Sequence, residues 1–229
     1  MFFAISDLHL STVVNKPMDI FGGNWDNYFE KIKTDWRERV TDGDVVLIAG
    51  DISWAMRLED AVPDLKEIAA LPGKKIIIKG NHEYWWNSYS KVKSVLPESV
   101  FAIQNDALKL SGAIFAGTRG WTVPDKNAAA EDVKIYEREK VRLKMTLDCA
   151  LKLRTQNEDI YVMTHYPPFN ALGADSDFTK IISEYPVKCV VYGHLHGKDA
   201  RAMFVVEKNG IKYYLTSCDL TGNKLVELN

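Results

Sequence analysis

Several short apolar runs in this sequence end at side chains that are typical metal ligands. The run at 75–79 is rich in β-branched residues and fits a buried strand, which Gly80 ends with a sharp backbone turn. Asn81 and His82 follow directly, so an amide oxygen and an imidazole stand at the carboxyl end of that strand, where open α/β sheets place their ligand sites. On its own the stretch also fits a solvated loop with an incidental histidine, so its interpretation depends on the other runs.

Two further runs carry the same pattern. Residues 1–5 are apolar and lead into Asp7 and His9, whose spacing of two places both side chains on one side of an extended chain. Such a pair can share one cation, although ordinary polar residues at a strand end are the alternative. The apolar run at 45–49 ends at Asp51, a carboxylate that is costly to bury unless it is paired or metal-bound. Asp51 is therefore the candidate for a ligand shared by two ions.

The remaining segments predict an α/β domain. Helical spacing of apolar residues, or in the longest case the lack of Gly and Pro, predicts helices at 25–40, 57–71, 88–96 and 131–156. Apolar runs predict strands at 100–103, 107–110, 113–116, 160–164 and 188–192, and antiparallel strands at 202–207, 211–216 and 225–228. The alternation of strand and helix in the first half predicts right-handed crossovers and a parallel core. Since no repeat or linker interrupts the chain, we expect a single domain over residues 1–229.

Composition narrows the function classes. The net charge of −2 provides no general attraction to nucleic acid or to an anionic membrane, so a long polyanion is a disfavoured substrate. The three cysteines, Cys149, Cys189 and Cys218, form no Cys-x-x-Cys pair, and we expect them to be reduced core residues of a cytoplasmic protein. The N-terminus does not resemble a signal sequence, and no apolar stretch approaches the length of a membrane span, so we expect neither.

All five histidines lie beside other ligand-type residues in short strings. These strings are Asp7-Leu8-His9, Gly50-Asp51, Gly80-Asn81-His82-Glu83, Thr164-His165-Tyr166-Pro167-Pro168 and Gly193-His194-Leu195-His196. In order and spacing the set resembles the calcineurin-like metallophosphoesterase family across residues 7–196. The resemblance implies an αββα fold, with a central β-sandwich of two mixed sheets flanked by helices.

The same resemblance implies a dinuclear metal centre. Asp7, His9, Asp51 and His196 would hold one ion, and Asp51, Asn81, His165 and His194 would hold the other. Oxygen and nitrogen ligands without thiolate suit manganese, iron, zinc or nickel, and we expect manganese. Two such ions about 3.5 to 4 Å apart can clamp a phosphoryl oxygen and lower the pKa of a bridging water. His82 is then left to donate a proton or hydrogen bond to the leaving oxygen.

The sequence departs from one branch of the family after Asp51. Protein serine/threonine phosphatases carry a second Asp there that orients the catalytic histidine, whereas this chain has Ile52-Ser53-Trp54. The Gly-His-Leu-His ending is more similar to bacterial phosphoesterases of small substrates. We therefore expect hydrolysis of a small or nucleotide-like phosphomonoester or diester. A nuclease, a protein phosphatase and a non-enzymatic scaffold are the alternatives.

Three side chains are candidates for substrate contacts. Arg119 lies in a glycine-bounded loop from which it could reach a phosphate, although a surface arginine beside turn glycines is the alternative. Trp85 follows the Gly-Asn-His-Glu string and Trp121 follows the arginine loop, so both rings could wall a pocket and stack on a flat group. Core packing at strand-to-helix turns is the alternative for both rings.

Overall fold

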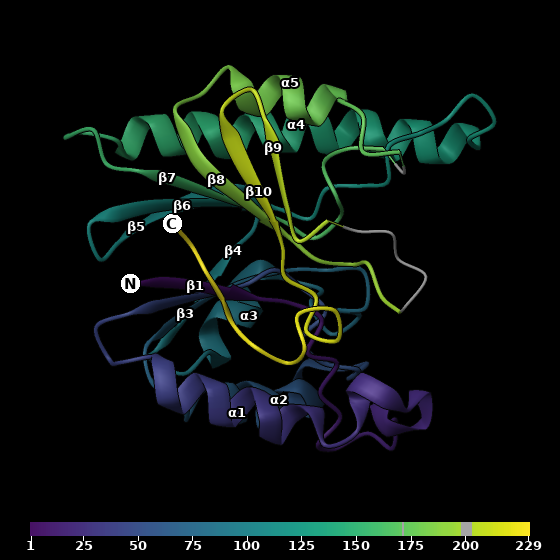
Figure 1. The fold of residues 1–229 in the computed structure, drawn as a ribbon, viewed down its shortest axis with the longest axis vertical. Helices are drawn as coiled ribbons and strands as arrows, with labels where there is room; N and C mark the ends of the chain where they lie inside the picture. Colours follow the sequence, from purple (N-terminus) through teal and green to yellow (C-terminus); the bar gives the residue numbers. More distant parts are fainter. Residues whose placement is uncertain (171, 198–202) are drawn as a thin grey trace.

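The computed structural model describes residues 1–170, 172–197 and 203–229, and its two β-sheets pack face to face between two layers of helices (Figure 1). The first sheet has the strand order β11-β1-β2-β3-β4. Its strands are β1 (Phe2–Ile5), β2 (Val45–Ile48), β3 (Lys74–Ile78), β4 (Val100–Ile103) and β11 (Val226–Glu227). The strands β1 to β4 pair in parallel, and β11 pairs antiparallel with β1 at one edge.

The second sheet has the strand order β5-β6-β7-β8-β10-β9. Its strands are β5 (Asp106–Leu110), β6 (Ala113–Thr118), β7 (Ile160–Thr164), β8 (Val187–Tyr192), β9 (Val205–Lys208) and β10 (Ile211–Leu215). The four central strands are parallel, and β5 and β9 are antiparallel to their neighbours at the edges. Both sheets are therefore mixed, as the αββα prediction requires.

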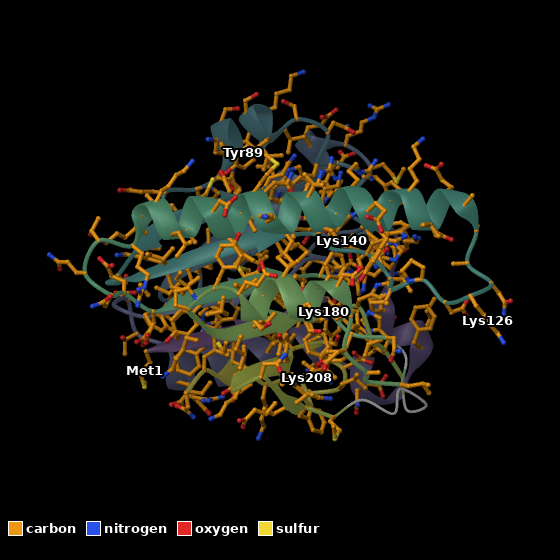
Figure 2. All side chains as sticks on the ribbon, turned by 90° about the horizontal axis from the view of Figure 1, so that it is seen from above. Met1, Tyr89, Lys126, Lys140, Lys180 and Lys208 are labelled. Atoms are coloured by element: carbon orange, nitrogen blue, oxygen red, sulfur yellow. The ribbon has the colours of Figure 1, made fainter. Side chains whose placement is uncertain are left out.

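Helices cover the outer faces of both sheets. They are α1 (Tyr28–Arg39), α2 (Leu58–Ala69), α3 (Tyr89–Val95), α4 (Ala130–Leu153) and α5 (Asp177–Ser183), with 3-10 turns η1 (Met18–Phe21) and η2 (Gly23–Trp25). The helices α1 and α2 lie against the first sheet, whereas α4 and α5 lie against the second (Figure 1). From above, α4 runs across the molecule with α5 beside it (Figure 2). Within the described ranges, no helix combines the length and apolar character that a membrane crossing requires.

Burial on both faces explains why the central strands are continuously apolar. In β1, Phe3 and Ile5 pack against the helices, whereas Ala4 faces the second sheet. In β2, Val46 faces the helices and Leu47 faces the second sheet. Successive side chains of a strand point to opposite faces, and here each face meets another apolar layer. The parallel strands of both sheets thus form three stacked core layers.

The predicted αββα architecture is confirmed, with three local differences. The first helix begins at Tyr28, because Trp25 belongs to the turn η2. The helix α5 was not predicted, since seven residues are too few to show a helical period, although Ser176 and Thr179 form a capping box at its start. The strand β10 pairs antiparallel with β9 as predicted, and on its other side it pairs in parallel with β8, a pairing that the sequence did not predict. Residue 202, the predicted start of the strand at 202–207, lies outside the described residues.

Candidate metal centre

The seven predicted metal ligands all follow the carboxyl ends of strands. Asp7 and His9 follow β1, Asp51 follows β2, Asn81 follows β3, His165 follows β7, and His194 and His196 follow β8. Backbone hydrogen bonds continue past the strand ends and join these loops. The amide of Asp7 donates to the Gly50 carbonyl at 2.9 Å, and the amide of Gly193 donates to the His165 carbonyl at 3.0 Å. The two sheets therefore present their ligand loops at a common edge.

One group of metal-binding side chains consists of Asp7, His9 and His196. Their candidate ligand atoms all lie within 4.8 Å of one another. His196 Nε2 is 3.3 Å from Asp7 Oδ1 and 3.4 Å from His9 Nε2. His9 Nε2 is also 3.8 Å from Asp51 Oδ2. These four side chains are the ones predicted for the first ion, and their atoms point toward one another as a chelating set would.

A second group lies on the other side of Asp51. Asp7, Asp51 and His165 also bring their ligand atoms within 4.8 Å of one another. His165 Nε2 is 3.4 Å from Asp51 Oδ2 and 2.6 Å from Asn81 Oδ1. His194 Nδ1 is 2.9 Å from the same amide oxygen. The side chains predicted for the second ion are thus close together. Asp7, which was predicted only for the first ion, lies with them.

The two carboxylates occupy different positions in this arrangement. Asp7 Oδ2 accepts hydrogen bonds from the hydroxyls of Ser6 and Ser217, at 2.5 and 2.9 Å, and from the His194 amide at 3.0 Å. Asp51 Oδ1 accepts from the His82 amide at 2.9 Å, which leaves Oδ2 facing imidazoles of both groups. Asp51 Oδ2 therefore faces imidazoles of both predicted ligand sets, whereas Asp7 is the carboxylate common to both groups of closely spaced ligand atoms.

The backbone at these positions is unusual. Asp7, His9, Asp51 and His194 have φ angles of 60°, 47°, 52° and 72°. This left-handed region costs a residue with a side chain roughly 1–2 kcal/mol, a penalty that surrounding structure sustains at functional sites. Asp7 and His9 are therefore not in the extended conformation from which their spacing was interpreted, and left-handed turns bring their side chains together instead.

Two glycines allow the carboxylates to approach the neighbouring loops. A Cβ atom at Gly80 would overlap Asp51 Oδ1 and lie 2.6 Å from the Asp51 amide nitrogen. A Cβ atom at Gly193 would overlap Asp7 Oδ2 and lie 2.8 Å from Ser6 Cβ. The glycines in the Gly-Asn-His and Gly-His-Leu-His strings are therefore explained by close packing around the carboxylates.

The four histidines among the predicted ligands differ in pKa. Burial lowers the pKa of His9 and of His194 to about 4. Burial also opposes a charge on His165, but the Asp51 carboxylate outweighs it and raises the pKa to about 9. In His196, burial is outweighed by hydrogen bonds to Asp219 and Asp7, which raise the pKa to about 10. At neutral pH and without a cation, two imidazoles are thus protonated and two are neutral.

Metal binding should therefore release protons. A histidine nitrogen must lose its proton before it can bind a cation. Since His165 and His196 have pKa values of about 9 and about 10, loading both sites at pH 7 should release about two protons. The affinity for metal should accordingly rise with pH up to about pH 10. Calorimetry in buffers of different ionisation enthalpy measures the proton count, and a count of zero would contradict the assignment of these two ligands.

Glu83 is a supporting residue that the sequence analysis did not single out. Its fully buried carboxylate accepts hydrogen bonds from the backbone amides of Asp51 at 3.0 Å and of Gly80 and Ile52, both at 2.5 Å. Burial and the nearby charge of Asp51 raise the pKa of Glu83 to about 7. Glu83 therefore ties the loop after β3 to the loop after β2, and fixes the position of Asp51 relative to Asn81.

Asp219 supports the other side of the centre and lies outside every recognised string. Its carboxylate is 2.9 Å from His196 Nδ1 and accepts from the Gly197 amide at 3.0 Å. A carboxylate on the far nitrogen of a ligating histidine holds the ring in place and increases its basicity. The buried carboxylate of Asp219 would thus support an ion through His196.

Replacing Asp219 with Asn should weaken metal binding without abolishing it. Loss of the carboxylate charge that faces His196 Nδ1 is expected to lower the affinity for one ion by about 10- to 100-fold. Equilibrium dialysis measures this change, and Asp42→Asn, at an exposed position, is the matched control. Unchanged affinity in Asp219→Asn would show that His196 needs no such support.

His82 lies beside the centre, and Trp54 packs against it. The side chain of His82 is 33% exposed, and its Nε2 is 3.9 Å from Asp51 Oδ2. The Trp54 ring is stacked on His9 with centroids 4.6 Å apart, and its centroid is 4.4 Å from that of His82. Among the described residues, His82 Nδ1 has no hydrogen-bond partner. The ring of Trp54 therefore restricts His82 by packing, where the protein phosphatases are expected to use a carboxylate.

The three predicted substrate contacts lie in different environments. Trp85 is 1% exposed and belongs to the core layer between the first sheet and its helices, which corrects its prediction because the ring has no face open to a ligand. Trp121 is half-buried and packs on Tyr166 at 5.0 Å, and Tyr166 in turn lies 4.2 Å from the His194 ring. The Arg119 side chain is 24% exposed and its guanidinium lies over the Trp121 ring. Trp121 is thus one aromatic ring, Tyr166, removed from His194, and the Arg119 guanidinium lies on the far side of Trp121.

The fold and the grouped carboxylates and imidazoles define a metal-binding αββα sandwich. A family model for the calcineurin-like phosphoesterases matches residues 1–198, and the chain belongs to that family. Membership implies metal-dependent hydrolysis of phosphoesters, and the Asp and His groups described above could bind the ions. The resemblance found in the sequence is thereby confirmed.

Other comparisons add little. No match was found among curated proteins. Among solved structures, a protein of unknown function from Aquifex aeolicus, AQ665, is similar, with 15% sequence identity and a TM-score of 0.49. The similarity covers 99% of this chain and 94% of that one.

Proposed function

We propose that this chain hydrolyses small or nucleotide-like phosphomonoesters or diesters with a dinuclear metal centre. The observation that carries the proposal is the convergence of seven ligand-type side chains, from five strand ends, into two adjoining groups. In this proposal the first ion is held by Asp7, His9, Asp51 and His196. The second ion is held by Asp51, Asn81, His165 and His194.

The donor set fits first-row transition metals, with manganese as the proposed ion. It contains imidazole nitrogens, carboxylate oxygens and an amide oxygen, and no thiolate. The buried Cys218 thiol donates a hydrogen bond to the Asp7 carbonyl at 3.1 Å and belongs to neither group. When bound, the ions would polarise the phosphoryl oxygens and lower the pKa of an attacking water. The protein side chains hold the ions and leave the exposed side of the centre open to a small substrate.

His82 is the proposed donor to the leaving oxygen. It is the one histidine of the five outside the two ligand sets, and a third of its side chain is accessible. Burial lowers the pKa of His82, which makes its protonated ring a stronger acid toward the leaving oxygen. Packing against Trp54 limits the rotation of the ring and keeps this donor directed at the substrate.

Metal analysis followed by a substrate panel tests the proposal. Purified protein should bind two ions per chain, and added manganese should support hydrolysis of nitrophenyl phosphate or bis-nitrophenyl phosphate. Comparison of the two esters identifies the preferred class. Failure to bind metal, or binding of two ions without hydrolysis of any ester in a broad panel, would contradict the proposal.

A further inference from the structure

A polar pocket lies beside the metal centre and is lined by more cationic than anionic side chains. It has a volume of about 240 Å³ and lies between the carboxyl ends of β3, β4 and β6 and the middle of α4. Its charged lining residues are Lys79, Arg119, Arg138, Arg142 and Glu139. None of the seven proposed metal ligands is among its lining residues. The pocket is therefore a separate feature, with four cations around one carboxylate.

Glu139 accounts for only part of this positive charge. Its side chain is fully buried, and its Oε1 accepts a hydrogen bond from Arg142 Nη1 at 2.6 Å. Arg138 Nε and Arg119 Nη2 are farther away, at 3.6 and 3.9 Å from the same oxygen. A buried carboxylate needs a partner, which Arg142 provides. The other three cations, Arg119, Arg138 and Lys79, are not needed to neutralise Glu139.

The surplus cations have donors that the protein does not use. Within the described part of the chain, neither the Arg119 nor the Arg138 guanidinium donates a hydrogen bond to the protein at 3.5 Å or less. Lys79 Nζ donates to the Trp86 carbonyl at 2.9 Å, which uses one of its three N–H groups. A guanidinium fork matches the oxygens of a phosphate group, and several such forks in one pocket favour a multiply charged anion.

The pocket and the metal centre share two loops. The Arg119 carbonyl accepts the amides of His165 at 2.9 Å and Tyr166 at 3.1 Å, so the arginine is fixed to the loop that carries a proposed ligand. Lys79 precedes the proposed ligand Asn81 by two residues. A molecule with two anionic groups could therefore place one at the metal centre and the other in the pocket.

We propose that this pocket binds a second phosphoryl group of the substrate, remote from the phosphoryl group that is hydrolysed. Four cations and one carboxylate leave the lining three charges positive, which suits a dianionic phosphoryl group. The assignment to the substrate rests on the proposed function, whereas binding of a phosphate-like anion by the pocket does not. The substrate class is thereby narrowed to compounds with at least two phosphoryl groups.

Anion binding is tested first, on protein freed of metal by dialysis against a chelator and then against plain buffer. Titration calorimetry with pyrophosphate should detect binding, and Arg138→Gln should weaken it about tenfold, the usual effect of removing one charged hydrogen-bond donor. Arg138 is 51% exposed, so its replacement leaves the core intact. Arg37→Gln removes the same charge from an exposed position on α1 and should leave the affinity unchanged. Absence of binding, or equal binding by Arg138→Gln, overturns the proposal.

A second variant tests the charge of the pocket by a different route. Gln104 lines the pocket, and its Oε1 accepts a hydrogen bond from Trp86 Nε1 at 2.7 Å. Gln104→Glu keeps an acceptor for Trp86 and adds a negative charge, so it should also weaken pyrophosphate binding about tenfold or more. Equal affinity in this variant would place the bound anion elsewhere and overturn the proposal.

Kinetics of the manganese-loaded protein distinguish whether the anion in the pocket is part of the substrate or is free phosphate. Arg138→Gln should raise the KM for esters with a second phosphoryl group at least about tenfold relative to the KM for nitrophenyl phosphate. If the KM values for both kinds of ester change in parallel, the pocket binds free phosphate and the assignment to the substrate is wrong. If the protein hydrolyses no ester, the proposed function fails, while the pyrophosphate titrations still decide whether the pocket binds anions.

Discussion

Asp51→Asn is expected to abolish hydrolysis and to lower the occupancy of both metal ions. Asp51 Oδ2 faces His9 at 3.8 Å and His165 at 3.4 Å, so it is the oxygen within reach of both proposed ligand sets. The substitution replaces one carboxylate oxygen with an amide NH₂, which cannot bind a cation. The other oxygen can still accept the hydrogen bond from the His82 amide, and the loop should keep its conformation.

Metal analysis by mass spectrometry and calorimetric titration measure this result. Wild-type protein should hold two ions, whereas Asp51→Asn should hold less than one under the same conditions. Asp42→Asn removes a carboxylate from an exposed turn and should leave metal content and activity unchanged. Two tightly held ions in Asp51→Asn would disprove the bridging role and would favour Asp7, which belongs to both ligand groups, as the shared residue.

The clustering of the predicted ligands could be expected from the sequence because each of them stands next to a strong local signal. The strands β1, β2, β3, β7 and β8 are mostly apolar, since both faces of each sheet are covered, and each ends at a polar string. Parallel strands bring their carboxyl ends to one edge. Hence the order of strand and string along the chain contains enough information to bring Asp7, Asp51 and His165 together.

The supporting residues could not be found in the same way. Asp219 follows β10 with no neighbouring ligand string, and it reaches His196 only because β10 lies beside β8 in the sheet. The role of Glu83 depends on three backbone amides from two loops, which no spacing rule reveals. In both cases the function arises from contacts between strands that are distant in sequence.

Trp85 shows why proximity along the chain is a poor guide to a pocket wall. It follows His82 by three residues, yet the turn between them points its ring into the core at 1% exposure. Trp54 shows the reverse case, since its ring packs on His9 and His82 at the edge of the centre. The backbone turn after a strand determines whether a large apolar side chain beside a ligand loop points into the core or toward the centre. The conformation of that turn could not be predicted from the sequence.

His82→Ala is expected to keep both ions and to slow hydrolysis by roughly 100- to 10,000-fold, the range that a positioned proton donor contributes. No predicted metal ligand is lost, because His82 lies outside both groups of metal-binding side chains. An alkyl phosphate leaves as a basic alkoxide and needs the donor, whereas nitrophenolate leaves readily without one. The rate should therefore fall much less for nitrophenyl phosphate than for an alkyl ester, and metal analysis should show two ions in the variant. Equal losses for both leaving groups would instead assign His82 to binding the phosphoryl group.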